Sequence, residues 1–154
     1  MAQPTREVYA PGLTDKQVSA EVDWMERFIE AADSLDWAKW QNFWDDSAVL
    51  CLNNTKIEGK AEIEKHFQQQ LGPIGYMKHV ITRLSFVVPP GLVYQSSNVA
   101  YKVRNDRLDR TIDVPAVAII HKQTGAEALT KFEAYNDLSL LRSVVEEVSK
   151  QNVT

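Results

Sequence analysis

The stretch that decides the fold is residues 36–46, DWAKWQNFWDD, which places three of the four tryptophans of the chain within eight positions. Trp37, Trp40 and Trp44 follow one another at spacings of three and four residues, so a short helix would carry all three on one face. Each indole buries a large apolar area when it packs. We therefore expect this helix to fill the narrow side of a core and the two aspartates after it to lie at its solvated end.

Two further helices flank this stretch. Residues 17–33 carry apolar side chains at three- and four-residue spacing, which predicts an amphipathic helix that Thr14 or Asp15 could cap. Residues 60–72, KAEIEKHFQQQLG, repeat apolar residues every four positions and end on a glycine. A further helical pattern at residues 138–150 could cap the open end of the core or pack on the surface of its own chain.

The remaining apolar segments read as strands. Two short ones, SAVLCLN and TKIEG, lie between the tryptophans and the helix at 60–72, and four long ones follow it at about 78–88, 92–104, 111–121 and 126–137. Because the helices come first and the long strands later, we expect an α+β fold with a mostly antiparallel sheet. Pro115 lies inside the third long strand, which favours a bulge or an edge position there.

Composition limits the classes of function. The chain has 154 residues, 44% hydrophobic, which suits a single domain at 17–150 after an N-terminal arm at 1–16. A formal net charge of −4 without a basic stripe argues against nucleic acid as a partner. The single cysteine, Cys51, excludes an internal disulfide, and the arm lacks an apolar run long enough for a signal sequence. We expect a cytoplasmic protein that does not enter a membrane.

Several loose motifs together resemble the NTF2-like superfamily, and within it the SnoaL-like small enzymes. They are AADSLDWAKWQNFWDDSAVLCLN, IEGKAEIEKHFQQQ, MKHVITRLSF and ALTKFEAYNDL, spread over roughly residues 18–138. The resemblance implies a strongly curved sheet wrapped around three N-terminal helices into a cone with an apolar pocket, commonly in a homodimer packed through the outer face of the sheet. Scytalone dehydratase, polyketide cyclases and isomerases of fungal meroterpenoid pathways are among the relatives.

Three side chains are the candidates for chemistry in such a cone. His79 opens the first long strand where the pattern resembles the catalytic histidine of scytalone dehydratase-like members, and an imidazole is an economical acid/base at neutral pH. Tyr101 shares the apolar parity of its strand and could donate a hydrogen bond to a developing enolate, or be a core aromatic whose hydroxyl is satisfied elsewhere. Glu133 would serve as their partner if it turns inward, where burial raises a carboxyl pKa; otherwise it pairs with a cation on the outer sheet face.

Five further residues are candidates for contact with the substrate, and each has a structural alternative. Trp24 and Trp40 could line the pocket or belong to the core. Cys51 takes the place of the base carboxylate of ketosteroid isomerase-like members, which disfavours that mechanism. Arg83 could hold a substrate carboxylate or carbonyl or be a surface cation, and Asp113 faces inward only if Pro115 causes no bulge.

The function that these residues favour is a cofactor-free isomerase, cyclase or dehydratase acting on an apolar polyketide- or terpenoid-like intermediate of secondary metabolism. We expect no cofactor and no metal, because the chain lacks a glycine-rich phosphate loop and a pair of histidines at metal-ligand spacing. A carrier that binds a ligand without chemistry, or a scaffold whose pocket is filled by its own side chains, stays open at this stage.

Overall fold

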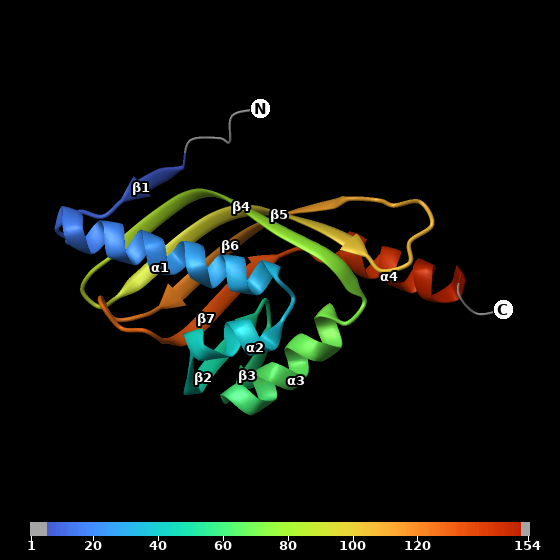
Figure 1. Cartoon of the computed structure of the whole chain (residues 1–154), viewed down its shortest axis with the longest axis horizontal. Helices are drawn as coiled ribbons and strands as arrows, with labels where there is room; N and C mark the ends of the chain where they lie inside the picture. Colours follow the sequence, from blue (N-terminus) through green and yellow to red (C-terminus); the bar gives the residue numbers. More distant parts are fainter. Residues whose placement is uncertain (1–5, 152–154) are drawn as a thin grey trace.

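The computed structural model describes residues 6–151 and shows one curved sheet with helices on its inner face (Figure 1). The elements in chain order are β1 (Glu7–Tyr9), α1 (Asp15–Asp33), α2 (Trp37–Trp40), a 3₁₀ turn (Gln41–Phe43), β2 (Trp44–Leu52), β3 (Thr55–Glu58), α3 (Lys60–Leu71), β4 (Ile74–Val87), β5 (Leu92–Val103), β6 (Ile112–His121), β7 (Leu129–Asn136) and α4 (Ser139–Gln151). The predicted α+β class is confirmed.

The sheet has the strand order β1-β4-β5-β6-β7-β2-β3. Its long strands pair antiparallel, whereas β1 pairs parallel with β4 and β2 pairs parallel with β7. Alternate residues of β5 from Val93 to Val103 are buried, and they define the inner face of the sheet that the helices cover. The other parity of β5 defines the outer face.

Two buried clusters fill the inner face. The first gathers the aromatic side chains of α1, α2 and β2 above β4–β7, and the second joins the end of α1 and the helix α4 to the far halves of β4, β5 and β6. The C-terminal helix is held there by Leu141, Val144 and Val148, which are all buried. The sheet therefore packs against α4 as well as against the expected N-terminal helices, and the prediction of three N-terminal helices describes the arrangement incompletely.

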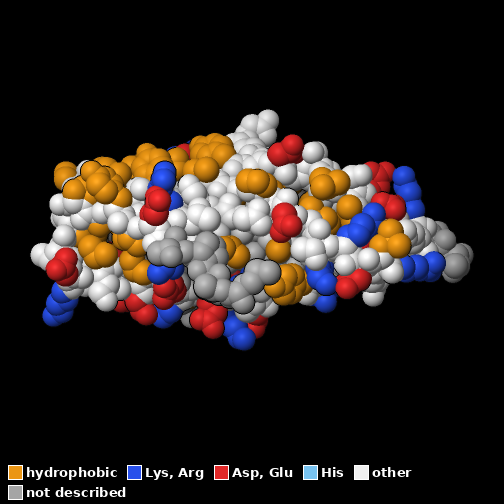
Figure 2. All heavy atoms as spheres, turned by 90° about the horizontal axis from the view of Figure 1, so that it is seen from above, with side chains coloured by type: hydrophobic (Ala, Val, Ile, Leu, Met, Phe, Trp, Pro, Cys, Tyr) orange, Lys and Arg blue, Asp and Glu red, His pale blue; other side chains and the backbone are white. Residues whose placement is uncertain are grey.

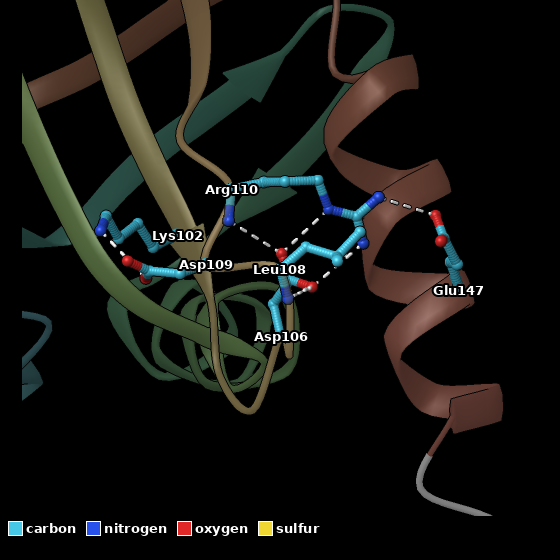
Figure 3. A network of polar contacts seen from close by, with 6 residues as sticks. All are labelled: Lys102, Asp106, Leu108, Asp109, Arg110 and Glu147. Atoms are coloured by element: carbon cyan, nitrogen blue, oxygen red, sulfur yellow. Dashed lines mark hydrogen bonds and ion pairs between the residues drawn. The ribbon is translucent and has the colours of Figure 1, made fainter.

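A polar network fixes the β5–β6 connection against α4 (Figure 3). Arg110 donates from Nε and Nη2 to the two carboxylate oxygens of Asp106, at 3.0 and 3.1 Å, and from Nη1 to Glu147 on α4 at 2.9 Å. The Asp106 side chain is only 1% exposed. Its hydrogen bonds from Arg110 lower its pKa to about 2, so this carboxylate stays charged and holds the guanidinium in place.

The N-terminal segment differs from the expected arm. The capping box of α1 forms between Thr14 and Gln17 as the sequence suggests. Before it, however, Glu7–Tyr9 add a parallel edge strand to β4, with Val8 opposite Leu84. Residues 1–5 of the predicted arm lie outside the described residues.

The tryptophan stretch is helical for one turn only. The 3₁₀ turn follows α2, and Trp44 begins β2, so the prediction of one helix face for all three tryptophans is wrong. The rings nonetheless meet, because Trp40 packs edge-on against Trp44 with centroids 5.0 Å apart and against Trp37 at 6.0 Å. The three rings pack together in the core as expected, although a short helix, a 3₁₀ turn and a strand carry them in place of one helix.

Pro115 lies within β6 and causes no bulge, since its pairing with Asn98 on β5 continues the regular register. The ladder between β6 and β7 begins only at Ala116 and Asn136. Pro115 thus has a strand neighbour on one side, and its missing N–H group faces the side where no ladder bond is made. Of the bulge and the edge position predicted for Pro115, the structure shows the edge position, because β7 does not pair with β6 at this residue.

Candidate functional site

A histidine and an aspartate meet on the inner face at the junction of the two buried clusters. Nδ1 of His79 lies 2.6 Å from Oδ1 of Asp33, and the backbone N–H of His79 donates to the other carboxylate oxygen at 3.0 Å. The two side chains are 17% and 11% exposed. Because one residue engages both oxygens, the position and the ring orientation of His79 are fixed relative to α1.

This contact decides which ring nitrogen is free to react. A carboxylate beside Nδ1 favours the tautomer that carries its proton on that nitrogen, as an orienting acid does beside a catalytic histidine. Among residues 6–151, Nε2 of His79 has no hydrogen-bond partner. This nitrogen is therefore the one that can exchange a proton with a ligand.

Asp33 was not among the residues that the sequence singled out. It is the last residue of α1, where the helix dipole disfavours a negative charge and where no basic side chain compensates it. A carboxylate in that place gains nothing from its own helix, and its stabilisation comes from the N–H groups of His79. An acid at a helix C-terminus is the signal that could have identified it.

Tyr101 lies on the same inner face, near the pair. It is 7% exposed and stands opposite Met77 on β4, while His79 stands opposite Val99, so Tyr101 and His79 are diagonal neighbours across the ladder. Burial raises the pKa of Tyr101 to about 12, and the charge of Asp33 adds to the shift. The phenol is therefore a hydrogen-bond donor at any physiological pH.

A hollow of about 260 Å³ reaches Tyr101 from the surface between the end of α3 and α4. Leu71, Ile74, Leu141 and Val145 supply apolar lining, and Arg142 is its cation. His79 and Asp33 do not line it. The hollow gives a ligand access to Tyr101. His79 lies on the neighbouring strand β4, diagonally across the ladder from Tyr101.

The aromatic candidates Trp24 and Trp40 belong to the core. Trp24 is 3% exposed, stacks on Phe28 with centroids 5.1 Å apart and donates from Nε1 to the carbonyl of Glu127 at 3.0 Å. Trp40 packs between both buried clusters and contacts Phe67 at 5.2 Å. Neither lines the hollow at Tyr101, so both tryptophans take the structural alternative.

Glu133 faces away from His79 and Tyr101. It stands opposite Ile119 on the outer face, where its Oε2 lies 2.6 Å from Nε2 of His121 and its Oε1 accepts a hydrogen bond from Tyr135 at 3.0 Å. The His121 contact holds the pKa of the Glu133 carboxyl below its usual range. The inward position and the raised pKa considered from the sequence are thus replaced by an outward position and a lowered pKa, and the three candidates for chemistry do not meet.

The remaining candidates also lie on the outer face. Cys51 stands opposite Glu133, and Asp113 is exposed and accepts a hydrogen bond from Asn98 at 3.1 Å. Arg83 is turned outward by a register shift between Ile81 and Arg83. Its guanidinium donates twice to Glu7 of β1, at 2.9 and 2.7 Å. These three residues are therefore not placed to touch a ligand of the cone.

Two features bear on other kinds of site. Among residues 6–151, no three His, Cys, Asp or Glu side chains come together as a metal-binding group. No helix in that part of the chain is both long and apolar enough to cross a membrane.

Comparison with known proteins places the fold. No family model matches the chain, and no curated protein matches it.

Among solved structures, a protein of Xanthomonas campestris with the provisional name of polyketide cyclase has a TM-score of 0.68 at 16% identity, with 82% of this chain and 97% of that one covered. A provisional SnoaL-like polyketide cyclase of Shewanella denitrificans has 0.67 at 16% identity, with coverage of 83% and 98%. A provisional NTF2-like dehydratase of Streptomyces avermitilis has 0.66 at 15% identity, with coverage of 82% and 100%. At these identities the likeness shows the fold alone, and the predicted resemblance is confirmed at the level of the fold, which this chain shares with structures named NTF2-like and SnoaL-like.

Proposed function

We propose that this protein is a cofactor-independent acid/base enzyme, an isomerase, cyclase or dehydratase, in which His79 and Tyr101 act on a carbonyl substrate and Asp33 positions His79. The observation that carries the proposal is the 2.6 Å contact between His79 and Asp33 on the inner face, beside a buried tyrosine. The names of the similar structures, cyclase and dehydratase, agree with this class of chemistry.

The proposed chemistry gives His79 and Tyr101 separate roles. Nε2 of His79 removes a proton from the carbon next to the substrate carbonyl, and the electron pair moves onto the carbonyl oxygen as an enolate. Tyr101, with a pKa of about 12, donates a hydrogen bond to that oxygen without giving up its proton. The imidazolium, stabilised by Asp33, then returns the proton to a different carbon, to a leaving hydroxyl, or to the alkoxide formed when the enolate attacks a second carbonyl.

The substrate that we propose is an apolar intermediate of the polyketide or terpenoid kind. The support is the apolar lining of the hollow beside Tyr101 and the mostly apolar inner face around His79. A volume of about 260 Å³ suits a small or partly inserted molecule, because pockets for drug-sized ligands begin at about 300 Å³. A compact ring with one carbonyl is the simplest molecule that fits these requirements.

The experiment follows proton exchange and does not require the natural substrate. The protein is incubated in D2O with a panel of cyclic ketones, enones and β-ketoesters, and the loss of α-protons is recorded by NMR. We expect accelerated exchange for at least one member, and a loss of about 100-fold or more in His79→Gln, as expected for a general base. Tyr101→Phe should also slow the exchange.

The chain supplies a matched control. His121→Gln removes the imidazole of the other histidine–carboxylate pair, which has the same 2.6 Å separation but lies on the outer face, and it should leave exchange unchanged. Equal losses in His79→Gln and His121→Gln, or exchange by the wild type no faster than in buffer, would contradict the proposal. Saturable binding of a ketone without exchange would instead support a carrier.

We also infer a homodimer that packs through the outer face. Val80, Val87, Tyr94, Val117 and Tyr135 of four neighbouring strands are each about 40% exposed on that face. Figure 2, which views the molecule from above Figure 1, shows hydrophobic side chains gathered along its upper left edge. Light scattering after size exclusion should give twice the chain mass of 17.5 kDa, and Tyr94→Glu with Val117→Glu should give a monomer. A monomeric wild type would refute the dimer and leave the chemistry untouched.

A further inference from the structure

A second and larger hollow lies between α2 and α3 and shares Leu71 with the hollow at Tyr101. It has a volume of about 530 Å³, and neither His79 nor Asp33 lines it. Its lining combines apolar side chains with charged ones at different places: Trp37, Phe67 and Leu71 on the one hand, and Asp36, Glu64 and Arg104 on the other. Nothing in the proposed chemistry uses this hollow.

Arg104 is held at one end of the hollow by contacts that leave most of its guanidinium free. Its Nε donates to the carbonyl of Gly72 at 3.1 Å, and its backbone N–H donates to the carbonyl of Pro73 at 2.8 Å. Its stem lies so close to Gly75 that a Cβ added there would be 3.2 Å from Cγ of Arg104. Among residues 6–151, the bond to Gly72 is the only one that the side chain makes. The two terminal amino groups are thus positioned and available for a carboxylate.

The other end of the hollow is acidic. Glu64 lies on the same face of α3 as Phe67, Gln68 and Leu71, which follow it at three, four and seven positions. Its carboxylate receives one long contact, from Nε2 of Gln68 at 3.4 Å. The rise of 1.5 Å per helical residue puts Glu64 about 12 Å from the level of Gly72, where Arg104 is held.

Asp36 adds a second carboxylate to the lining of the hollow. One of its oxygens caps α2 through the N–H of Ala38 at 3.0 Å, and the other is free of that bond. The hollow therefore presents one cation at the end of α3, two carboxylates elsewhere and an apolar middle. A ligand with a negative group, an apolar middle and a positive group would match all three parts.

We propose that this hollow binds an extended zwitterion of tripeptide length, with its carboxylate on Arg104 and its ammonium group at Glu64. An extended chain of three residues spans about 10 Å, which agrees with the separation of about 12 Å along α3. Side chains of the peptide would lie over Trp37, Phe67 and Leu71. This site goes beyond the proposed function and does not depend on it.

The test uses trialanine and its two capped forms, titrated into the full chain and followed by calorimetry. We expect saturable binding of trialanine, and binding about threefold or more weaker for both trialanine amide and N-acetyl-trialanine, since partly exposed ion pairs contribute modestly. Arg104→Gln should no longer distinguish the free peptide from the amide. Glu64→Gln should lose part of the discrimination against the acetylated form while keeping the discrimination against the amide.

Matched variants separate the site from general effects of charge. Arg107→Gln and Glu62→Gln remove the same charges from residues that do not line the hollow, and they should bind trialanine as the wild type does. Gly75→Ala keeps every charge but crowds the stem of Arg104, so it should weaken trialanine and spare the discrimination due to Glu64. If Arg104→Gln fails to fold by circular dichroism, Arg104→Met replaces it, since methionine keeps an aliphatic stem beside Gly75 and removes the charge. Absence of saturable binding, or equal affinity for free and capped peptides in the wild type, would overturn the proposal.

Discussion

Lys122 forms the most buried ion pair recorded between described residues, and its replacement by methionine should destabilise the fold strongly. Nζ of Lys122 lies 2.7 Å from Oε2 of Glu21 on α1, and the two side chains are 1% and 6% exposed. The ammonium group also donates to the carbonyls of Gln123 and Ala126, at 3.1 and 2.9 Å, and lies 4.9 Å from the ring centroid of Trp24.

The expected loss follows from what methionine leaves behind. Two carbonyls lose their donor, and the buried carboxylate of Glu21 keeps only the N–H of Gly125 at 2.7 Å. Removal of one partner of a buried ion pair costs about 3–5 kcal/mol, because the other charge stays buried without compensation. For a chain of this length such a loss lowers Tm by about 10 °C. The loop at 122–128 would then detach from the helix that carries Asp33.

Urea denaturation followed by tryptophan fluorescence measures this loss. The double variant Glu21→Gln with Lys122→Met removes both charges and should recover about 2 kcal/mol or more relative to the single one. Lys150→Met is the control, since Lys150 pairs with Glu146 on the exposed surface of α4 at 3.0 Å, and it should cause no measurable change. A loss below about 1 kcal/mol in Lys122→Met, or a double variant no more stable than the single, would refute the reasoning.

Three further changes test the energetics of the fold. The pKa of Tyr101 is raised to about 12, so its share of stability is complete below pH 10 and is lost as the pH rises toward 12; Tyr101→Phe should show about 2 to 3 kcal/mol less loss in urea denaturation over that window. The pKa of Asp106 is lowered to about 2, so its contribution is present above about pH 4 and is lost as the pH falls through 2; Asp106→Asn should be less stable at pH 6 and show a shallower decline in acid, by the same assay. Phe28 is fully buried and its ring packs against Trp24 at 5.1 Å, so Phe28→Ala should cost about 3–5 kcal/mol by denaturation, and an unchanged midpoint would contradict the cluster.

Strand parity predicted the inner face well where the register is regular. On β5 the buried residues alternate from Val93 to Val103 without a break, and Tyr101 lies inward as expected. On β4 the register shift before Arg83 reverses the parity that holds at His79, and the side chain turns outward to β1. The bulge shows in the sequence only as a change of parity between Ile81 and Leu84. The exposed Val80 and Val87 obscure that change, so the reversal was not predicted.

The partner of His79 was beyond sequence reasoning for a different reason. Asp33 lies 46 residues before His79, and the 2.6 Å contact depends on how the end of α1 crosses β4. Glu133 was a candidate partner only if it turned inward, and the sequence left open the alternative that it pairs with a cation on the outer face. Its neighbours Phe132 and Ala134 stand opposite Ile120 and Ala118, both buried, and this alternation directs Glu133 to the outer face.

The two histidine–carboxylate pairs show why a short contact alone does not define a site. The distances are the same, 2.6 Å in each. His79 lies on the inner face near a buried tyrosine, whereas His121 is 31% exposed on the outer face beside Tyr135, which donates to the same carboxylate. If the outer face joins two chains, the His121 pair becomes part of that interface. Replacement of His79 should then reduce activity, and replacement of His121 should alter association of the two chains. The two measurements would separate the roles of two pairs with the same local geometry.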